Sequence, residues 1–135
     1  MRYLLDSNAC IAILKGSPES VQRRLREELH RRSEVFLSAI CSFELWYGVA
    51  KSTRREFNRI KLDGLLSGAL PTLAFENEDA MYAGEVRARL EEIGRPAGAY
   101  DVLIAGQAIR HELVLVTANT REFARIKGLK VENWA

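Results

Sequence analysis

Three acidic side chains of this sequence stand where apolar runs should continue. Asp6 ends one apolar stretch, Glu44 interrupts a second, and Asp101 directly precedes a third. A carboxylate that loses its hydration is costly unless it is paired or bound to a cation, so three such cases call for one shared explanation. Asn119 adds an amide just after a fourth apolar stretch. The pattern predicts that these four side chains form a pocket for a divalent metal ion.

The remaining potential metal ligands narrow the choice of ion. The only histidines are His30 and His111, and the only cysteines, Cys10 and Cys41, lie far apart in the chain. Oxygen ligands suit a hard ion such as Mg²⁺ or Mn²⁺ and argue against zinc. One or two such ions would orient a water molecule, lower its pKa and stabilise a phosphoryl group during in-line attack. The chemistry that follows is metal-dependent hydrolysis of a phosphodiester.

Structural explanations compete with the metal site at all four positions, and for Glu44 the alternative is a salt bridge. Asp6 could accept backbone N–H bonds at the start of a helix, and Asp101 could cap its own helix. Asn119 is followed three residues later by Glu122, which is the spacing of a capping box. Glu44 has no capping role, because it falls in the middle of a predicted helix on an apolar face.

The elements that must position these residues alternate between strands and helices. The predicted strands are 2–6, 35–37, 73–75, 113–117 and 129–132. The first predicted helix follows a cap at Ser7 or Asn8 and ends near 14, and the second begins at Pro18 behind an N-cap at Ser17 and ends at 32. The others run over 39–51 and 53–66, from a cap at Asn77 through Leu90, and over 100–110 and 120–126. Strands too far apart for hairpins predict an α/β fold, a parallel sheet flanked by helices on both faces, in a single domain over residues 1–135.

The predicted topology brings the candidate residues together. Sites on open parallel sheets form at the carboxyl ends of the strands. Asp6 ends the first strand and Asn119 follows the fourth, so both belong to the same edge. Glu44 would reach that edge from the inner face of its helix, and Asp101 from the start of its own.

Composition and charge indicate the cell compartment and the binding partners to expect for this protein. With 135 residues, 47% of them hydrophobic, the chain is large enough for one core. The net charge is +2, but residues 1–67 hold 12 Lys/Arg against 8 Asp/Glu. Two rows of basic residues, within 23–32 and 51–61, could attract a phosphate backbone, or form solvated helix faces paired with neighbouring glutamates. Without a signal peptide, a long apolar run or a disulfide pattern, we expect a cytoplasmic protein with no membrane association.

Several segments resemble one known family in order and spacing. They are Leu4-Leu5-Asp6-Ser7-Asn8, Ser38-Ala39-Ile40 with Phe43-Glu44-Leu45 and Tyr47-Gly48, Gly98-Ala99-Tyr100-Asp101-Val102-Leu103-Ile104-Ala105, Val116-Thr117-Ala118-Asn119 with Glu122-Phe123, and the ending Gly128-Leu129-Lys130-Val131-Glu132-Asn133-Trp134. Together they are similar to the blocks of the PIN domain, and more narrowly to the VapC toxins of bacterial toxin–antitoxin pairs. The resemblance runs from Met1 to Trp134.

The resemblance implies a Mg²⁺- or Mn²⁺-dependent endoribonuclease that forms a homodimer and is held inactive by a cognate antitoxin. By matching positions, Asp6 and Asp101 would be the principal metal ligands, and Glu44 would help to position or deprotonate the attacking water. Asn119 would support the metal shell, and Thr117 would hold the end of its strand. The segment 87–105 resembles a subset of these toxins that cut the anticodon stem-loop of initiator tRNA, which makes tRNA the expected substrate.

Departures from the family pattern leave two other functions open. Ser7 stands where threonine is usual, Ala99 where proline is common, and Asn119 where some members have aspartate. The neutral Asn119 keeps open a non-catalytic RNA-binding or antitoxin-binding module. An aspartate-nucleophile phosphatase would also begin with Asp6, but it usually needs a second aspartate where this chain has Asn8.

Trp46 and Tyr47 could stack on unpaired bases or pack in the core or a dimer interface.

Overall fold

In the computed structural model, which describes residues 1–68 and 70–135, five parallel strands form one sheet in the order β3-β2-β1-β4-β5. The strands are β1 (Arg2–Leu5), β2 (Glu34–Ser38), β3 (Thr72–Leu73), β4 (Val114–Val116) and β5 (Val131–Glu132). In the register of the central strands, Leu5 is opposite Leu37 of β2 and Val116 of β4. The predicted parallel sheet is confirmed, with β1 at its centre.

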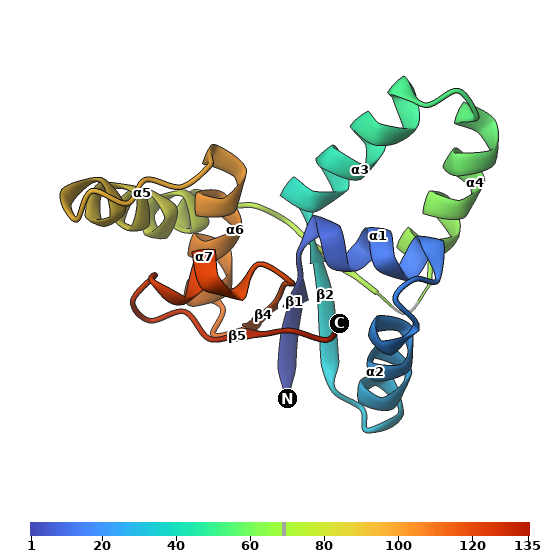
Figure 1. Ribbon diagram of the computed structural model, residues 1–135, viewed down its shortest axis with the longest axis horizontal. Coiled ribbons are helices and arrows are strands. Elements are labelled where there is room, and N and C mark those ends of the chain that lie inside the picture. Colours follow the sequence, from blue (N-terminus) through green and yellow to red (C-terminus); the bar gives the residue numbers. More distant parts are fainter. Residues whose placement is uncertain (69) are drawn as a thin grey trace.

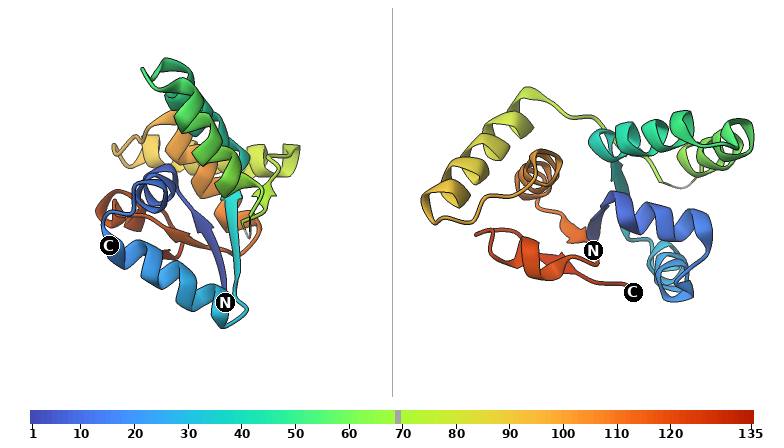
Figure 2. Two further views of the ribbon diagram at one scale, coloured as in Figure 1. Left: turned by 90° about the vertical axis from the view of Figure 1, so that its right-hand side faces the viewer. Right: turned by 45° about the horizontal axis from the view of Figure 1, so that its top comes forward.

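Helices cover both faces of the sheet, as predicted. They are α1 (Ser7–Lys15), α2 (Glu19–His30), α3 (Ala39–Lys51), α4 (Arg55–Leu66), α5 (Asn77–Glu92), α6 (Ala99–Arg110) and α7 (Thr120–Ala124). Helices α1 to α4 lie to one side of the central strands and α5 to α7 to the other (Figure 1). The hairpin of α3 and α4 projects past the ends of the strands (Figure 2). Among the described residues, no helix is long and apolar enough to cross a membrane.

The central strands are apolar because both of their faces are covered. Leu4, Leu5 and Leu115 are fully buried, and Val116 is nearly so. Strands of parallel sheets read as continuous hydrophobic runs for this reason, since neither face meets water. A polar residue that directly follows such a strand therefore lies at the boundary of the core.

Several predicted boundaries differ from the structure for local reasons. Helix α2 has Pro18 as its N-cap and no side-chain cap, so the predicted capping by Ser17 is wrong. Helix α5 is capped by Glu76, whose side chain forms a capping box with Asp79, and the predicted cap Asn77 is its first residue. The third strand ends at Leu73 rather than at 75, because the buried Gln107 side chain donates to the carbonyl oxygens of residues 73 and 74.

Helices α5 and α6 approach each other closely at Gly106. A Cβ atom at this position would lie 2.6 Å from the Cα atom and 2.8 Å from the Cβ atom of Ala83, both in α5. Such a separation is too short for a real side-chain contact. Gly106 therefore permits the close packing of the two helices, and α6 carries Asp101 in its first turn.

The first row of basic residues is largely used within the fold. Glu28 is only 2% exposed, and its carboxylate accepts from Arg24 at 2.8 Å, Arg31 at 3.1 Å and the Ser33 hydroxyl at 2.8 Å. Burial opposes ionisation of Glu28, but these hydrogen bonds and charges outweigh it and lower its pKa. For Arg24 and Arg31, pairing with a glutamate of the same helix is the interpretation that the structure supports.

Candidate functional site

The ends of strands β1 and β4 meet at Asp6. Its backbone N–H donates to the carbonyl oxygen of Val116 at 3.1 Å, and its Oδ1 accepts from the Ala9 N–H at 2.8 Å. Asp6 is therefore the N-cap of α1, as its structural alternative predicted, and it is also buried. The predicted cap at Ser7 or Asn8 is wrong, because Ser7 is already the first helical residue. The capping bond uses one carboxylate oxygen and holds the side chain in place. Thr117 follows β4 and is buried beside Asp6.

Glu44 enters this region from α3. Its side chain is half-buried, and its Oε1 accepts a hydrogen bond of 2.6 Å from the hydroxyl of Ser7. Because Ser7 is the first residue of α1, this contact joins the start of α1 to the middle of α3 across 37 positions of sequence. The prediction that Glu44 faces inward is confirmed, and the sequence offered no signal for its partner Ser7 beyond the family pattern.

Asp101 lies in the first turn of α6. The N-cap of this helix is Gly98, so Asp101 does not cap its own helix and that alternative is wrong. Its side chain is half-buried, with Oδ2 3.7 Å from the position of a Cβ atom on Gly98. A carboxylate in the first turn interacts favourably with the helix dipole, and this position leaves it free to bind a cation.

The three carboxylates affect one another's ionisation. Burial raises the pKa of Asp6, hydrogen bonding to Thr117 opposes that rise, and the nearby charges of Asp101 and Glu44 add to it. Burial also raises the pKa of Asp101, with further contributions from Glu44 and Glu122. Like charges raise a carboxyl pKa only when they are close. Residues from the end of β1, from α3 and from α6 therefore share one acidic site, and Glu122 of α7 borders it.

Asn119 is the least embedded of the four candidates. It is exposed and occupies the N-cap position of α7, but its side chain makes no capping hydrogen bond. The capping box suggested by the spacing to Glu122 is not formed, because Glu122 pairs with Arg125 at 2.8 Å instead. The backbone N–H of Asn119 donates to Thr117 Oγ1 at 2.9 Å, which fixes the turn after β4. Its role in a metal site stays a prediction.

The donor chemistry of this site fits a hard cation. In the described part of the chain, no three acidic, histidine or cysteine side chains stand close enough to form a ready metal cluster. The crowded groups nevertheless offer oxygen atoms only. Cys41 is buried nearby, and burial raises the pKa of its thiol to about 12, so it supplies no thiolate. A divalent cation would relieve the repulsion among the carboxylates, and Mg²⁺ or Mn²⁺ matches these ligands.

Exposed aromatic side chains border the acidic site. A hollow of about 490 Å³ is lined by Ser7, Glu44 and several aromatic residues. Among them, Tyr47 is 58% exposed, and the rings of Phe43 and Tyr100 meet edge to face with centroids 5.7 Å apart. Packing against the core, one of the alternatives for residues 46 and 47, therefore holds for Trp46, which contacts the core from a half-buried position. Tyr47 faces the solvent beside the carboxylates.

Comparison with known proteins identifies the family of this site. The pattern of the PIN domain matches residues 3–129. The chain is 38% identical over 134 residues to the tRNA(fMet)-specific endonuclease VapC of Salmonella typhimurium, covering 99% of this chain and 98% of the relative. It is 41% identical over 134 residues to Ribonuclease VapC2 of Rickettsia felis, with the same coverage. The chain belongs to the VapC family of PIN-domain ribonuclease toxins.

Solved structures of VapC relatives have the same fold. A crystal structure of VapBC2 from Rickettsia felis bound to a promoter DNA fragment superposes with a TM-score of 0.92 at 40% identity, covering all of both chains. A structure of DNA-bound VapBC from Salmonella typhimurium gives a TM-score of 0.91 at 37% identity, covering 100% of this chain and 99% of that one. The likeness therefore extends over the whole PIN domain.

Proposed function

We propose that this PIN domain is a Mg²⁺-dependent endoribonuclease, in which Mn²⁺ can substitute, and that it acts as the toxin of a type II toxin–antitoxin pair. The observation that carries the proposal is the meeting of Asp6, Glu44 and Asp101 at one edge of the sheet, where burial and like charge raise the pKa of both aspartates. A site built to hold crowded negative charge needs a cation.

The proposed roles follow from how each side chain is held. Asp6 and Asp101 would be the principal metal ligands, since Asp6 is fixed by its capping bond and Asp101 by the first turn of α6. The bound ion would activate a water molecule and stabilise charge on the scissile phosphate. Glu44, held by the Ser7 hydroxyl, would orient that water or accept its proton. Asn119 would support the metal shell.

We propose tRNA as the substrate, with the anticodon stem-loop of initiator tRNA as the first candidate. Two relatives that share 36–38% identity with this chain are named tRNA(fMet)-specific endonucleases. The exposed aromatic residues beside the acidic site support an RNA with unpaired bases, because sequence-specific RNA recognition mostly uses stacking on unstacked loop bases. Tyr47 and Tyr100 lie where a base next to the scissile phosphate could stack.

The proposed partners are a cognate antitoxin and a second copy of this chain. Relatives of known structure are VapBC assemblies, which supports an antitoxin partner. An arginine of that partner could satisfy several of the site's carboxylates in place of metal. We also place the protein in the cytoplasm, where its two free buried cysteines would stay reduced.

The direct test is RNA cleavage by the purified protein freed of its partner. We expect it to cut initiator tRNA in Mg²⁺ and to stop in EDTA. Asp6→Asn and Asp101→Asn should each lower the rate by at least about 100-fold, because each removes a charged ligand. Asp63→Asn is the matched control, since Asp63 is exposed in α4 and pairs only with Arg59. Site variants that cut as fast as the parent would rule out this mechanism.

Metal titration separates the enzyme from the alternative, a non-catalytic binding module. A nuclease should bind Mn²⁺, and Asp101→Asn should weaken that binding strongly. A binding module would keep its affinity for RNA or antitoxin in EDTA and would show no cleavage at any metal concentration.

A further inference from the structure

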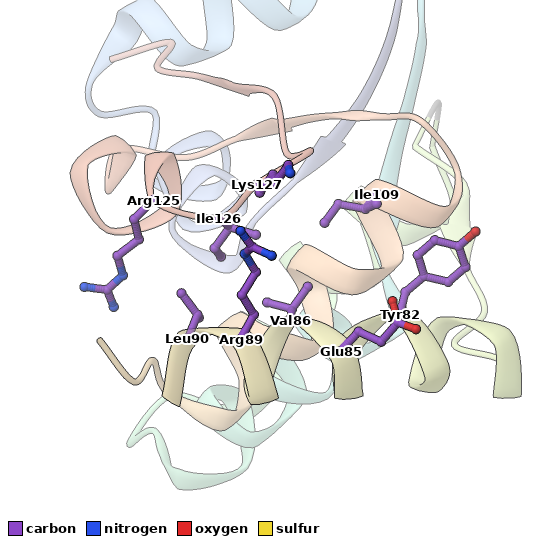
Figure 3. A pocket seen from close by; sticks show the side chains of 9 residues that line it. All are labelled: Tyr82, Glu85, Val86, Arg89, Leu90, Ile109, Arg125, Ile126 and Lys127. Carbon is purple, nitrogen blue, oxygen red and sulfur yellow. The ribbon is translucent and has the colours of Figure 1, made fainter. Parts of the chain in front are cut away.

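A second hollow, of about 250 Å³, lies between α5 and the segment that follows α7. Its floor is apolar, with Leu90 of α5 and Ile126 after α7 among the lining residues, and Ile109 at the end of α6 closes one side. Figure 3 shows Arg89 reaching from α5 toward this segment, where Lys127 stands at the opposite edge. The hollow is thus bordered by cations from two separate elements, and by one carboxylate, that of Glu85 in α5, beside Tyr82.

Arg89 and Lys127 are available to a ligand. Both are exposed, and neither forms an ion pair among residues 1–68 and 70–135. Arg125 also lines the hollow, but it is held by Glu122 at 2.8 Å and by the carbonyl oxygen of Pro96 at 3.1 Å. Figure 3 shows its guanidinium directed away from the other two cations. Two free positive charges beside one opening favour an anionic ligand that contacts both.

The hollow is connected to the acidic site through the Arg125–Glu122 pair. Glu122, which forms this ion pair, lies in α7, and α7 begins directly after the turn that follows β4, where the Val116 carbonyl oxygen accepts from the Asp6 N–H at 3.1 Å. An RNA strand bound at the carboxylates therefore needs only to cross α7 to reach Arg89 and Lys127. The acidic site repels the phosphates of RNA, and the neighbouring basic hollow attracts them. This arrangement of charge would orient a polyanion across both.

An aromatic ring favours RNA over a small anion. Tyr82 lines the hollow and is 41% exposed, and Figure 3 shows its ring at the far side from Arg125. Proteins that bind single-stranded nucleic acid combine cations that follow the backbone with aromatic rings on which bases stack.

We infer that this hollow binds the phosphodiester backbone of the RNA substrate beside the cleaved segment, with Arg89 and Lys127 contacting phosphates and Tyr82 stacking on a base. The inference rests on the proposed ribonuclease function and adds a second point of contact to it. Its effect is on RNA affinity, because the hollow lies outside the carboxylate site.

The test is tRNA binding in an Asp101→Asn background, measured by fluorescence anisotropy over a range of salt concentrations. The slope of log K against log salt is negative, and each lost phosphate contact should reduce its magnitude by about 0.7 to 0.9. At roughly 0.1 M salt this corresponds to a Kd about five- to eightfold higher. We expect this loss for Arg89→Gln and for Lys127→Gln. Tyr82→Leu should weaken binding without changing the slope, because stacking releases no counterions.

Matched variants control for overall charge and for folding. Arg26→Gln in α2 and Lys130→Gln near β5 remove exposed cations that do not line the hollow, and each should change the Kd less than twofold. Arg89→Lys should restore most of the affinity, since it keeps the charge. Melting curves that match the parent would show that the variants fold.

Any of three results would overturn the inference. One is parent-like affinity and salt slope in both Arg89→Gln and Lys127→Gln. Another is an equal loss in the control variants, which would show a general charge effect. Weakened capture of the antitoxin with unchanged RNA binding would also overturn it. Cleavage by the parent protein is measured separately, so a parent that does not cut RNA refutes the proposed function alone.

Discussion

Replacing Gly106 by alanine tests whether the close packing of α5 and α6 positions the acidic site. The added Cβ would lie 2.6 Å from Ala83 Cα and closer still to Ala83 N, whereas ordinary Cβ contacts begin near 3.4 Å, so the helices must separate by about 1 Å. Overpacking against a backbone costs about 3 kcal/mol, at the upper end of the usual range. Alanine stabilises a helix by about 1 kcal/mol relative to glycine, so the free energy of unfolding should fall by a net amount of about 2 kcal/mol.

The loss can be measured by thermal denaturation. At about 2.1 cal/mol/K per residue, the unfolding entropy of a chain of 135 residues converts 2 kcal/mol into a fall in Tm of about 7 °C. Gly64→Ala in α4 is the matched control, because a Cβ there would meet nothing within 4 Å. It should gain about 0.5–1 kcal/mol and raise the Tm by about 2–4 °C.

The same substitution should also reduce RNA cleavage. Asp101 is five residues before Gly106 in α6, so a displaced helix moves this carboxylate relative to Asp6. A misplacement of about 1 Å can cost about 100-fold in rate. The reasoning is refuted if Gly106→Ala melts at or above the temperature of the parent, since the two helices would then have room for the methyl group.

Two further predictions concern buried charge. In the metal-free protein, the raised pKa values of Asp6 and Asp101 mean that the native state binds more protons than the unfolded chain, so stability should fall as pH rises through those folded pKa values. Asp101→Asn should therefore stabilise the metal-free protein at pH 7 by about 0.5 kcal/mol, which raises the Tm by about 2 °C in thermal denaturation with EDTA. An unchanged or lower Tm would count against repulsion among the three carboxylates. Glu28→Gln breaks a buried ion pair and should cost about 3 kcal/mol in urea denaturation at pH 7. Because the pKa of Glu28 is lowered in the folded protein, ionised Glu28 stabilises the fold above about pH 4.3, and this stabilisation is lost as pH falls through the folded pKa. The free energies of unfolding of the parent and of Glu28→Gln should therefore become equal in acid.

The elements next to the site could be predicted closely because their signals are local. Helix α3 spans the predicted residues 39–51, and the hydroxyl oxygen of Ser38 accepts the capping bond from the Ile40 N–H at 3.0 Å. The first strand ends at Leu5, one residue before the prediction, because Asp6 starts the cap of α1. An apolar run followed by a capping side chain can be recognised within a few residues.

Side-chain partners distant in the sequence could not be predicted. Arg24, which pairs with Glu28 four residues along α2, also pairs with Glu132 of β5 at 2.7 Å, 108 positions away in the sequence. The bond between Ser7 and Glu44 joins positions 37 apart, and no periodicity signals it. Such contacts depend on how the helices dock on the sheet, which local patterns do not encode.

The sequence alone determined that the chain forms a parallel α/β domain, and it singled out Asp6, Glu44 and Asp101, because a carboxylate within an apolar run needs an explanation wherever it occurs. The tertiary structure decided which of their alternatives hold: Asp6 is both a cap and a site residue, Asp101 is not a cap, and Asn119 stands exposed at the margin. It also brought basic side chains of α5 and of the segment after α7 to one hollow. The reason is physical. The cost of burying a carboxylate can be recognised from the apolar residues next to it in the sequence, whereas contacts between distant elements form only when those elements pack together.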